Sequence, residues 1–218
     1  MAVITISREL GSEGSYIANR VAQALGYILV DKRIIEQVLS QYGYVQFGED
    51  YESAPNIWER MDPDKGNMIS MLNRVLLAMA SFGNVVIMGR GSFAVLGDFT
   101  DVLNVRLQAP LTARVRRIMN ERNIREIDTA EALVRESDKV RASFIQSWYG
   151  VRWDDAAAFD LVIDTIKVPP DMAVKWIVEA HQGLKDLHIS FKPTTKVIQV
   201  DRVLAGAVAD ALNQLAVH

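Results

Sequence analysis

The chain has 218 residues, which is enough to bury one substantial hydrophobic core with small appendages. Its net charge of −3 argues against a general nucleic-acid-binding protein, because such proteins carry a strongly basic face. The absence of cysteine excludes disulfides and thiolate metal sites and fits a reducing compartment. The sequence has neither a signal-peptide pattern nor a run of about 18 apolar residues, so we expect a cytoplasmic protein without a membrane partner.

The first segment of interest joins a buried strand to a helix through a loop that contains glycine. Residues 3–6 are a β-branched run, residues 11–15 form the loop, and apolar residues then recur at helical spacing. Such a loop presents backbone N–H groups at the positive end of a helix dipole, where phosphate binds well. A complete P-loop ends in Gly-Lys-Ser/Thr, whereas this loop ends in Gly14-Ser15 and the first lysine of the chain is Lys32.

The segments that follow alternate between strands and helices. We predict strands at 27–30, 85–88, 101–107 and 161–164, and helices at 32–42, 68–82, 111–148 and 171–184. Residues 43–67 lack periodicity and are long for a plain connection, which favours a functional insertion. The alternation predicts an α/β fold with a parallel sheet covered on both faces, in which ligands bind at the carboxyl ends of the strands.

The last segment, residues 187–218, has a different pattern. Apolar and polar residues alternate at 187–191, a second strand-like run covers 196–200, and Asp201 precedes an amphipathic helix. This segment is either an edge hairpin with a helix on the same domain or the interface of a homodimer. The pattern favours neither alternative.

Arginine is concentrated in one part of the chain. Nine of its 16 arginines lie between residues 106 and 152, and the planar guanidinium group suits bidentate phosphate binding. Most of them are expected to pair with nearby glutamates on solvated helix faces. Arg135, Asp138 and Arg141 recur at a spacing of three, which predicts one shared helical face, and Arg152 follows them. These three arginines are candidates for a clamp that closes on a phosphate.

Other charged residues fall where strands of the predicted sheet end. Arg90 follows a buried strand between Gly89 and Gly91, and glycines permit the close approach of an anion. The alternative for Arg90 is a structural ion pair. Asp31 and Asp164 follow two other strands, and each is either a helix cap or a ligand contact.

Six segments together resemble the cytidylate kinase-like family, a divergent branch of the nucleoside monophosphate (NMP) kinases. In order they read ITISRELGSEGSYIA, LGYILVD, VVIMGRG, VRLQAPLTAR, DKVRA and FDLVIDT, over about residues 2–180. The resemblance implies a three-layer P-loop kinase-like fold with a five-stranded parallel sheet, formed by residues 1–186. It also implies an NMP-binding insertion at 43–67 and a lid at 136–157, with residues 187–218 as an extension outside the likeness.

The same resemblance implies roles for individual residues. Small residues of the loop would hold the phosphates of ATP: Gly11, Ser12, Gly14 and Ser15, with the hydroxyl of Ser15 on Mg²⁺. Arginines would cancel the charge of the transferred phosphoryl group: Arg90, Arg135, Arg141 and Arg152. Arg90 would also bind the acceptor together with Asp31. Since the P-loop lysine is missing, Arg8 at the end of the first strand is the candidate that replaces it.

Two classes of function fit these motifs. The first is an enzyme that uses Mg²⁺ to transfer the γ-phosphoryl group of ATP to a small nucleotide such as CMP, or to another small acceptor. The second is a nucleotide-binding regulatory module without kinase activity. The missing lysine favours the module, whereas the set of arginines favours the enzyme, because a simple binding protein needs fewer lid cations.

Overall fold

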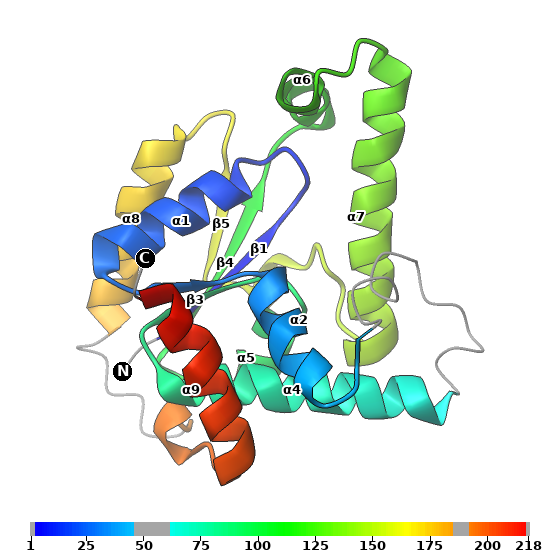
Figure 1. Ribbon diagram of the computed structural model, residues 1–218. Coiled ribbons are helices and arrows are strands. Elements are labelled where there is room, and N and C mark those ends of the chain that lie inside the picture. Colours follow the sequence, from blue (N-terminus) through cyan, green and yellow to red (C-terminus); the bar gives the residue numbers. More distant parts are fainter. Residues whose placement is uncertain (1–2, 46–61, 185–191, 217–218) are drawn as a thin grey trace.

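A computed structural model describes residues 3–45, 62–184 and 192–216 of the protein (Figure 1). Five strands form one parallel sheet in the order β2-β3-β1-β4-β5. The strands are β1 (Val3–Arg8), β2 (Ile28–Val30), β3 (Val85–Met88), β4 (Val102–Gln108) and β5 (Leu161–Asp164). The helices are α1 (Gly14–Leu25), α2 (Lys32–Gln41), α4 (Pro63–Phe82), α5 (Ser92–Leu96), α6 (Leu111–Arg122), α7 (Ile127–Tyr149), α8 (Pro170–Leu184) and α9 (Arg202–Ala216).

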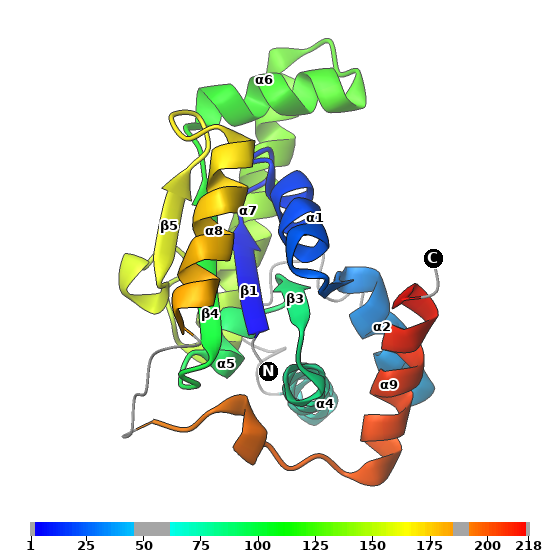
Figure 2. The same ribbon diagram turned by 90° about the vertical axis from the view of Figure 1, so that its left-hand side faces the viewer.

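Strand β1 occupies the middle of the sheet and is buried on both faces. Ile4 and Ile6 pack with α1 and α8 on one face, whereas Val3 packs with α4 and α5 on the other. Figure 2 looks onto the face that α1 and α8 cover. Burial on both faces is typical of a parallel sheet, and the predicted three-layer α/β fold with five parallel strands is confirmed.

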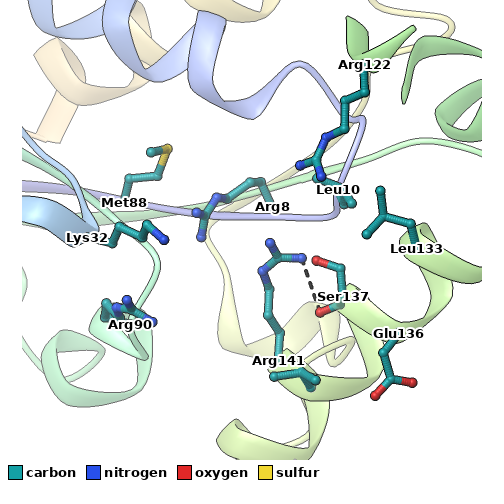
Figure 3. A pocket seen from close by; sticks show the side chains of 11 residues that line it. Arg8, Leu10, Lys32, Met88, Arg90, Arg122, Leu133, Glu136, Ser137 and Arg141 are labelled. Carbon is teal, nitrogen blue, oxygen red and sulfur yellow. Dashed lines mark hydrogen bonds between the residues drawn. The ribbon is translucent and has the colours of Figure 1, made fainter. Parts of the chain in front are cut away.

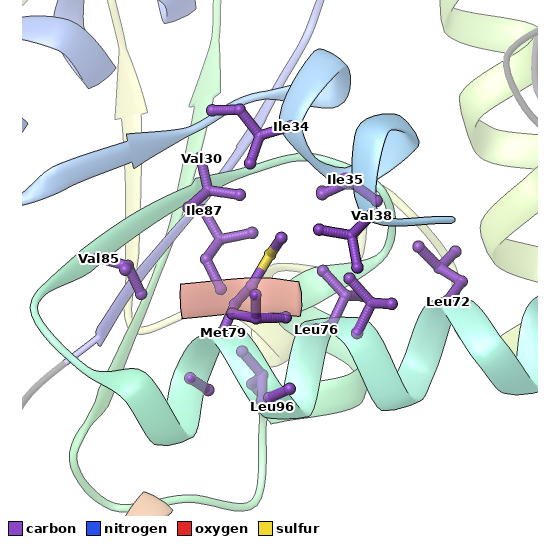
Figure 4. Packing of buried hydrophobic residues seen from close by; sticks show 14 of the residues in the cluster. Val30, Ile34, Ile35, Val38, Leu72, Leu76, Met79, Val85, Ile87 and Leu96 are labelled. Atoms are coloured by element: carbon purple, nitrogen blue, oxygen red, sulfur yellow. The ribbon is translucent and has the colours of Figure 1, made fainter. Parts of the chain in front are cut away.

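The larger core lies between the sheet and helices α2 and α4 (Figure 4). Val30 and Ile87 of the sheet meet Ile35 of α2 and Leu76 and Met79 of α4, and none of these side chains is exposed to solvent. Each such side chain stabilises the fold by about 1.5–3 kcal/mol relative to leaving it in water. This packing fixes α2, whose first turns face the end of β3.

Two helix predictions need correction. The helical region predicted at 111–148 is two helices, because Asn123 adopts a left-handed conformation (φ 55°) and ends α6. Helix α4 begins at Pro63 rather than at residue 68, because the carboxylate of Asp62 accepts a hydrogen bond from the N–H of Asp64 at 2.9 Å. The predicted insertion therefore ends in a helix, and residues 46–61 lie outside the described part of the chain.

In the described part of the extension, a short 3₁₀ turn and one α-helix are the regular elements. The strand predicted at 196–200 is wrong, because Thr195 begins a 3₁₀ turn there. The N–H and the hydroxyl of Thr195 both donate to the carboxylate of Asp101, at 2.7 and 2.6 Å. The last helix is confirmed as α9, and Asp201 caps it by accepting a backbone N–H of the first turn. Helix α9 packs against α2 and α4 (Figure 2). The run at 187–191 lies outside the described residues.

Candidate active site

The carboxyl end of β1 continues into the loop that was predicted to bind phosphate. The loop runs from Glu9 to Glu13 and enters α1 at Gly14. Ser12 closes it, because both its N–H and its hydroxyl donate to the carbonyl of Glu9, at 3.3 and 2.8 Å. The predicted strand, loop and helix are therefore confirmed, and the N-terminus of α1 opens onto a cavity.

Glu9, the first residue of the loop, has a structural role. Its carboxylate accepts hydrogen bonds from Arg106 at 3.3 Å and from the N–H of Ala109 at 3.1 Å, and it forms an ion pair with Arg114 at 3.2 Å. Arg106 also donates to the carbonyl of Trp153 at 2.8 Å and stacks over its ring, 4.5 Å from the centroid. Burial lowers the pKa of the Arg106 guanidinium, and the negative charge of Glu9 opposes this shift. The loop is thus fixed to β4 by buried charges.

A second set of contacts ties the loop to helix α7. The carboxylate of Asp138 accepts the N–H of Leu10 at 3.2 Å and a guanidinium N–H of Arg114 at 2.6 Å. Leu10 also packs against a small hydrophobic cluster formed by α6 and α7, which includes Val115 and Val134. Helix α7 therefore lies against this loop through both polar and apolar contacts.

Two cavities meet at this loop. The smaller one, of about 240 Å³, lies over the loop and the first turn of α1. The larger one, of about 460 Å³, lies between the ends of β1 and β3 and helix α7 (Figure 3). Arg8, Leu10 and Arg141 line both cavities. The other residues around the larger cavity are Lys32, Met88, Arg90, Arg122, Leu133, Glu136, Ser137 and Val140. Five cationic side chains face one carboxylate there, which favours an anionic ligand.

Arg90 lies at the end of β3, where the glycine-flanked arginine was predicted. The residue is 4% exposed, and its backbone adopts a left-handed conformation (φ 56°) that residues other than glycine rarely take. Its guanidinium forms an ion pair with Glu36 of α2. Arg90 therefore makes the structural ion pair and also lines the larger cavity, close to Lys32 and Arg8 (Figure 3).

Two further predicted residues lie near the loop. Ser15 is exposed in the first turn of α1 and lines the smaller cavity with Gly11 and Gly14. Asp31 caps α2, because its carboxylate accepts the N–H groups of residues 33 and 34 at 3.0 and 3.2 Å. Of the two alternatives for Asp31, the structure has the helix cap.

The structure does not bring all of the predicted lid arginines together. Arg141 lines both cavities, but Arg135 is 63% exposed and pairs with Glu131 at 2.7 Å. Six residues of helix advance by about 600°, so the two arginines point about 120° apart rather than along one face. Arg152 is 73% exposed and pairs with Asp154 at 3.0 Å, which raises the pKa of Arg152. Neither Arg135 nor Arg152 lines the two cavities.

Two cations of the larger cavity were missed in the sequence. Lys32 follows β2 at the carboxyl edge of the sheet, so the criterion that selected Arg90 would also have found it. Arg122 is the last residue of α6 and is placed by the turn at Asn123. No glycine or proline marks that turn in the sequence.

The described residues contain no cluster of three or more His, Cys, Asp or Glu side chains that could hold a metal ion. Mg²⁺ fits this site in another way, because it commonly keeps water ligands and takes most of its remaining oxygens from substrate phosphates. The smaller cavity offers the hydroxyl of Ser15 and the carboxylates of Glu13 and Glu121. These are oxygen donors of the kind that Mg²⁺ prefers.

The fold and the site together define the class of the protein. A parallel sheet whose first strand leads through a phosphate-type loop into a helix, beside a cavity rich in arginine, is the architecture of the P-loop kinases. Among the described helices, none is long and apolar enough to cross a bilayer.

Comparison with known proteins identifies the family. The model of the cytidylate kinase-like family matches residues 3–167, and the chain belongs to that family. The cytidylate kinase of Ignicoccus hospitalis is 30% identical over 180 residues, which cover 81% of this chain and 97% of that protein. The cytidylate kinase of Pyrobaculum aerophilum is 27% identical over 178 residues, which cover 80% and 90%. The crystal structure of an uncharacterized protein from Eubacterium ventriosum has the same fold, with a TM-score of 0.67, 20% identity and coverage of 84% and 99%.

Proposed function

We propose that the protein uses Mg²⁺ to transfer the γ-phosphoryl group of ATP to a nucleoside monophosphate, with CMP as the first acceptor to test. Its family and its relatives named cytidylate kinase support this class of reaction and this choice of acceptor. The observation that carries the proposal is that two cavities adjoin and share Arg8 and Arg141. Two phosphorylated ligands held side by side in this way are positioned for direct transfer.

The two cavities suggest how the ligands divide between them. The triphosphate of ATP would lie over the loop, where the backbone N–H groups of α1 face the smaller cavity. The phosphate of the acceptor would lie in the larger cavity, near Lys32 and Arg90. Its oxygen would form a bond to the γ-phosphorus while the bond to the β–γ bridging oxygen breaks and ADP leaves.

Phosphoryl transfer of this kind needs positioning and cancellation of charge rather than covalent catalysis. Arg8 and Arg141, which line both cavities, would lie nearest to the transferred group. The apolar residues Met88, Leu133 and Val140 line the larger cavity and would limit the water that reaches it.

The proposal is tested with the purified protein, ATP, Mg²⁺ and a panel of nucleoside monophosphates and small hydroxylated acceptors. We expect release of ADP that depends on one acceptor, with the phosphorylated acceptor formed in equal amount. An Arg90→Ala variant provides the acceptor-side control, because it should raise the acceptor KM without weakening ATP binding. Measurable ATP binding without turnover of any acceptor would contradict the proposal and support the regulatory module instead.

A further inference from the structure

We propose that Arg8 is the catalytic cation of this site and replaces the lysine that is missing from the loop. Its guanidinium would contact the β- and γ-phosphates of ATP and the phosphoryl group during transfer. This inference rests on the proposed function, because it assigns a residue to that reaction. The loop residues are neutral or acidic from Glu9 to Ser15, so a cation for these phosphates must come from outside the loop.

The path of the Arg8 side chain is kept open by two glycines from separate elements. Arg8 is the last residue of β1, and its side chain crosses the N-terminus of α1. A Cβ atom at Gly14 would lie 2.5 Å from the Cγ of Arg8, and a Cβ atom at Gly89 would overlap its Nη1. Any larger residue at either position would therefore displace the guanidinium from the place where it now lies.

Arg8 lies at the boundary between the two cavities. Arg8 lines the cavity over the loop and the larger cavity beside it, and it also borders a small space beside Arg90. Figure 3 shows Arg8 between Lys32 on one side and Arg141 on the other. Arg8 therefore borders the ligand space on both sides, as Arg141 does.

The electrostatic surroundings of Arg8 also favour a bound phosphate. The N-terminus of α1 carries partial positive charge, and Lys32, Arg90 and Arg141 line the same cavity. Arg90 pairs with Glu36 and Arg141 lies 3.6 Å from Asp138, but the cavity lining still has five cations to one carboxylate, and a bound anion reduces that excess of positive charge.

The test compares Arg8→Met, which keeps the apolar stem but removes the charge, with Arg8→Lys and Arg8→Ala. We expect kcat to fall by a factor on the order of 100 or more in Arg8→Met, with a smaller loss in Arg8→Lys. Added guanidinium ion should restore part of the activity of Arg8→Ala, because the deleted side chain leaves its path open. Arg20→Ala, an exposed arginine of α1, is the matched control and should keep wild-type kcat.

Two results would overturn the assignment. One is wild-type kcat in Arg8→Met, and the other is a loss in Arg8→Ala that guanidinium ion does not restore, as expected for a purely structural arginine. If the wild-type protein turns over no acceptor, the proposed function fails, but the role of Arg8 in phosphate binding can still be tested by measuring nucleotide affinity. Arg8→Met should then bind a non-hydrolysable ATP analogue about tenfold or more weakly while AMP binding stays unchanged, and equal affinity for the analogue would refute its role.

Discussion

Asp138 offers the sharpest test of how helix α7 is attached to the phosphate loop. Its side chain is 19% exposed, accepts the N–H of Leu10 at 3.2 Å and pairs with Arg114 at 2.6 Å. Asp138→Ala removes both contacts and a longer ion pair with Arg141 at 3.6 Å, and it leaves the buried guanidinium of Arg114 with one carboxylate, that of Glu9, at 3.2 Å. A hydrogen bond to a charged group contributes about 1.5–3 kcal/mol, and loss of a buried ion-pair partner costs about 3–5 kcal/mol.

Because Glu9 still compensates Arg114, we expect Asp138→Ala to lower the free energy of unfolding by about 2–4 kcal/mol. Urea denaturation monitored by circular dichroism measures this loss, and an unchanged slope of free energy against denaturant shows that the surface exposed on unfolding is the same. Lys139→Ala is the matched control on the same helix, because Lys139 is exposed, lines neither cavity and lies 3.7 Å from Glu136. A loss below about 0.5 kcal/mol in Asp138→Ala would refute the attachment.

Three further predictions concern the site and the core. Arg90→Ala should raise the acceptor KM at least about tenfold in steady-state kinetics, and an equal loss of ATP affinity would contradict its place on the acceptor side. Burial raises the pKa of Tyr27 above its ordinary value of 10.0, so the unfolded chain loses this proton first and the free energy of unfolding should fall as the pH rises above that value. Tyr27→Phe should abolish this part of the pH dependence and cost about 1–2 kcal/mol at neutral pH, because the buried His181 loses a hydrogen bond of 2.9 Å. Leu76→Ala should lower the free energy of unfolding by about 2–5 kcal/mol in the same urea assay, and a loss under about 1 kcal/mol would show that its site collapses around the cavity.

Much of the fold was predictable because its signals are local. Strands β1 and β3 are short runs rich in β-branched residues, which predict buried strands. The glycines that follow β1 predict the loop before α1. The break after α6 was not predictable, since Asn123 alone takes the left-handed conformation there. The strand-like pattern at 196–200 failed for a tertiary reason, because Thr195 is held by Asp101, which lies 94 residues earlier.

The site residues at the ends of strands were predictable from the sequence. Those whose position depends on the direction in which a side chain leaves a helix were not. Arg8 and Arg90 follow from the ends of β1 and β3, which meet at one edge of the sheet. Lys32 also lies just after the carboxyl end of a strand, β2, so the same reasoning would have selected it. Arg135 and Arg141 point in different directions from α7, because a spacing of six residues does not bring two side chains onto one helical face. The roles of these residues in phosphate binding remain predictions.

The stacking of Arg106 on Trp153 gives the protein an optical reporter of its own site. The indole is 7% exposed, donates a hydrogen bond to Ser7 at 2.9 Å, and carries a guanidinium 4.5 Å above its ring. The same guanidinium holds Glu9, the first residue of the loop. A ligand that shifts the loop changes the charge next to the ring, and the emission of the indole should change with it. We therefore expect nucleotide binding to change the fluorescence without a label or turnover, and a Trp153→Phe variant separates this signal from that of the other three tryptophans.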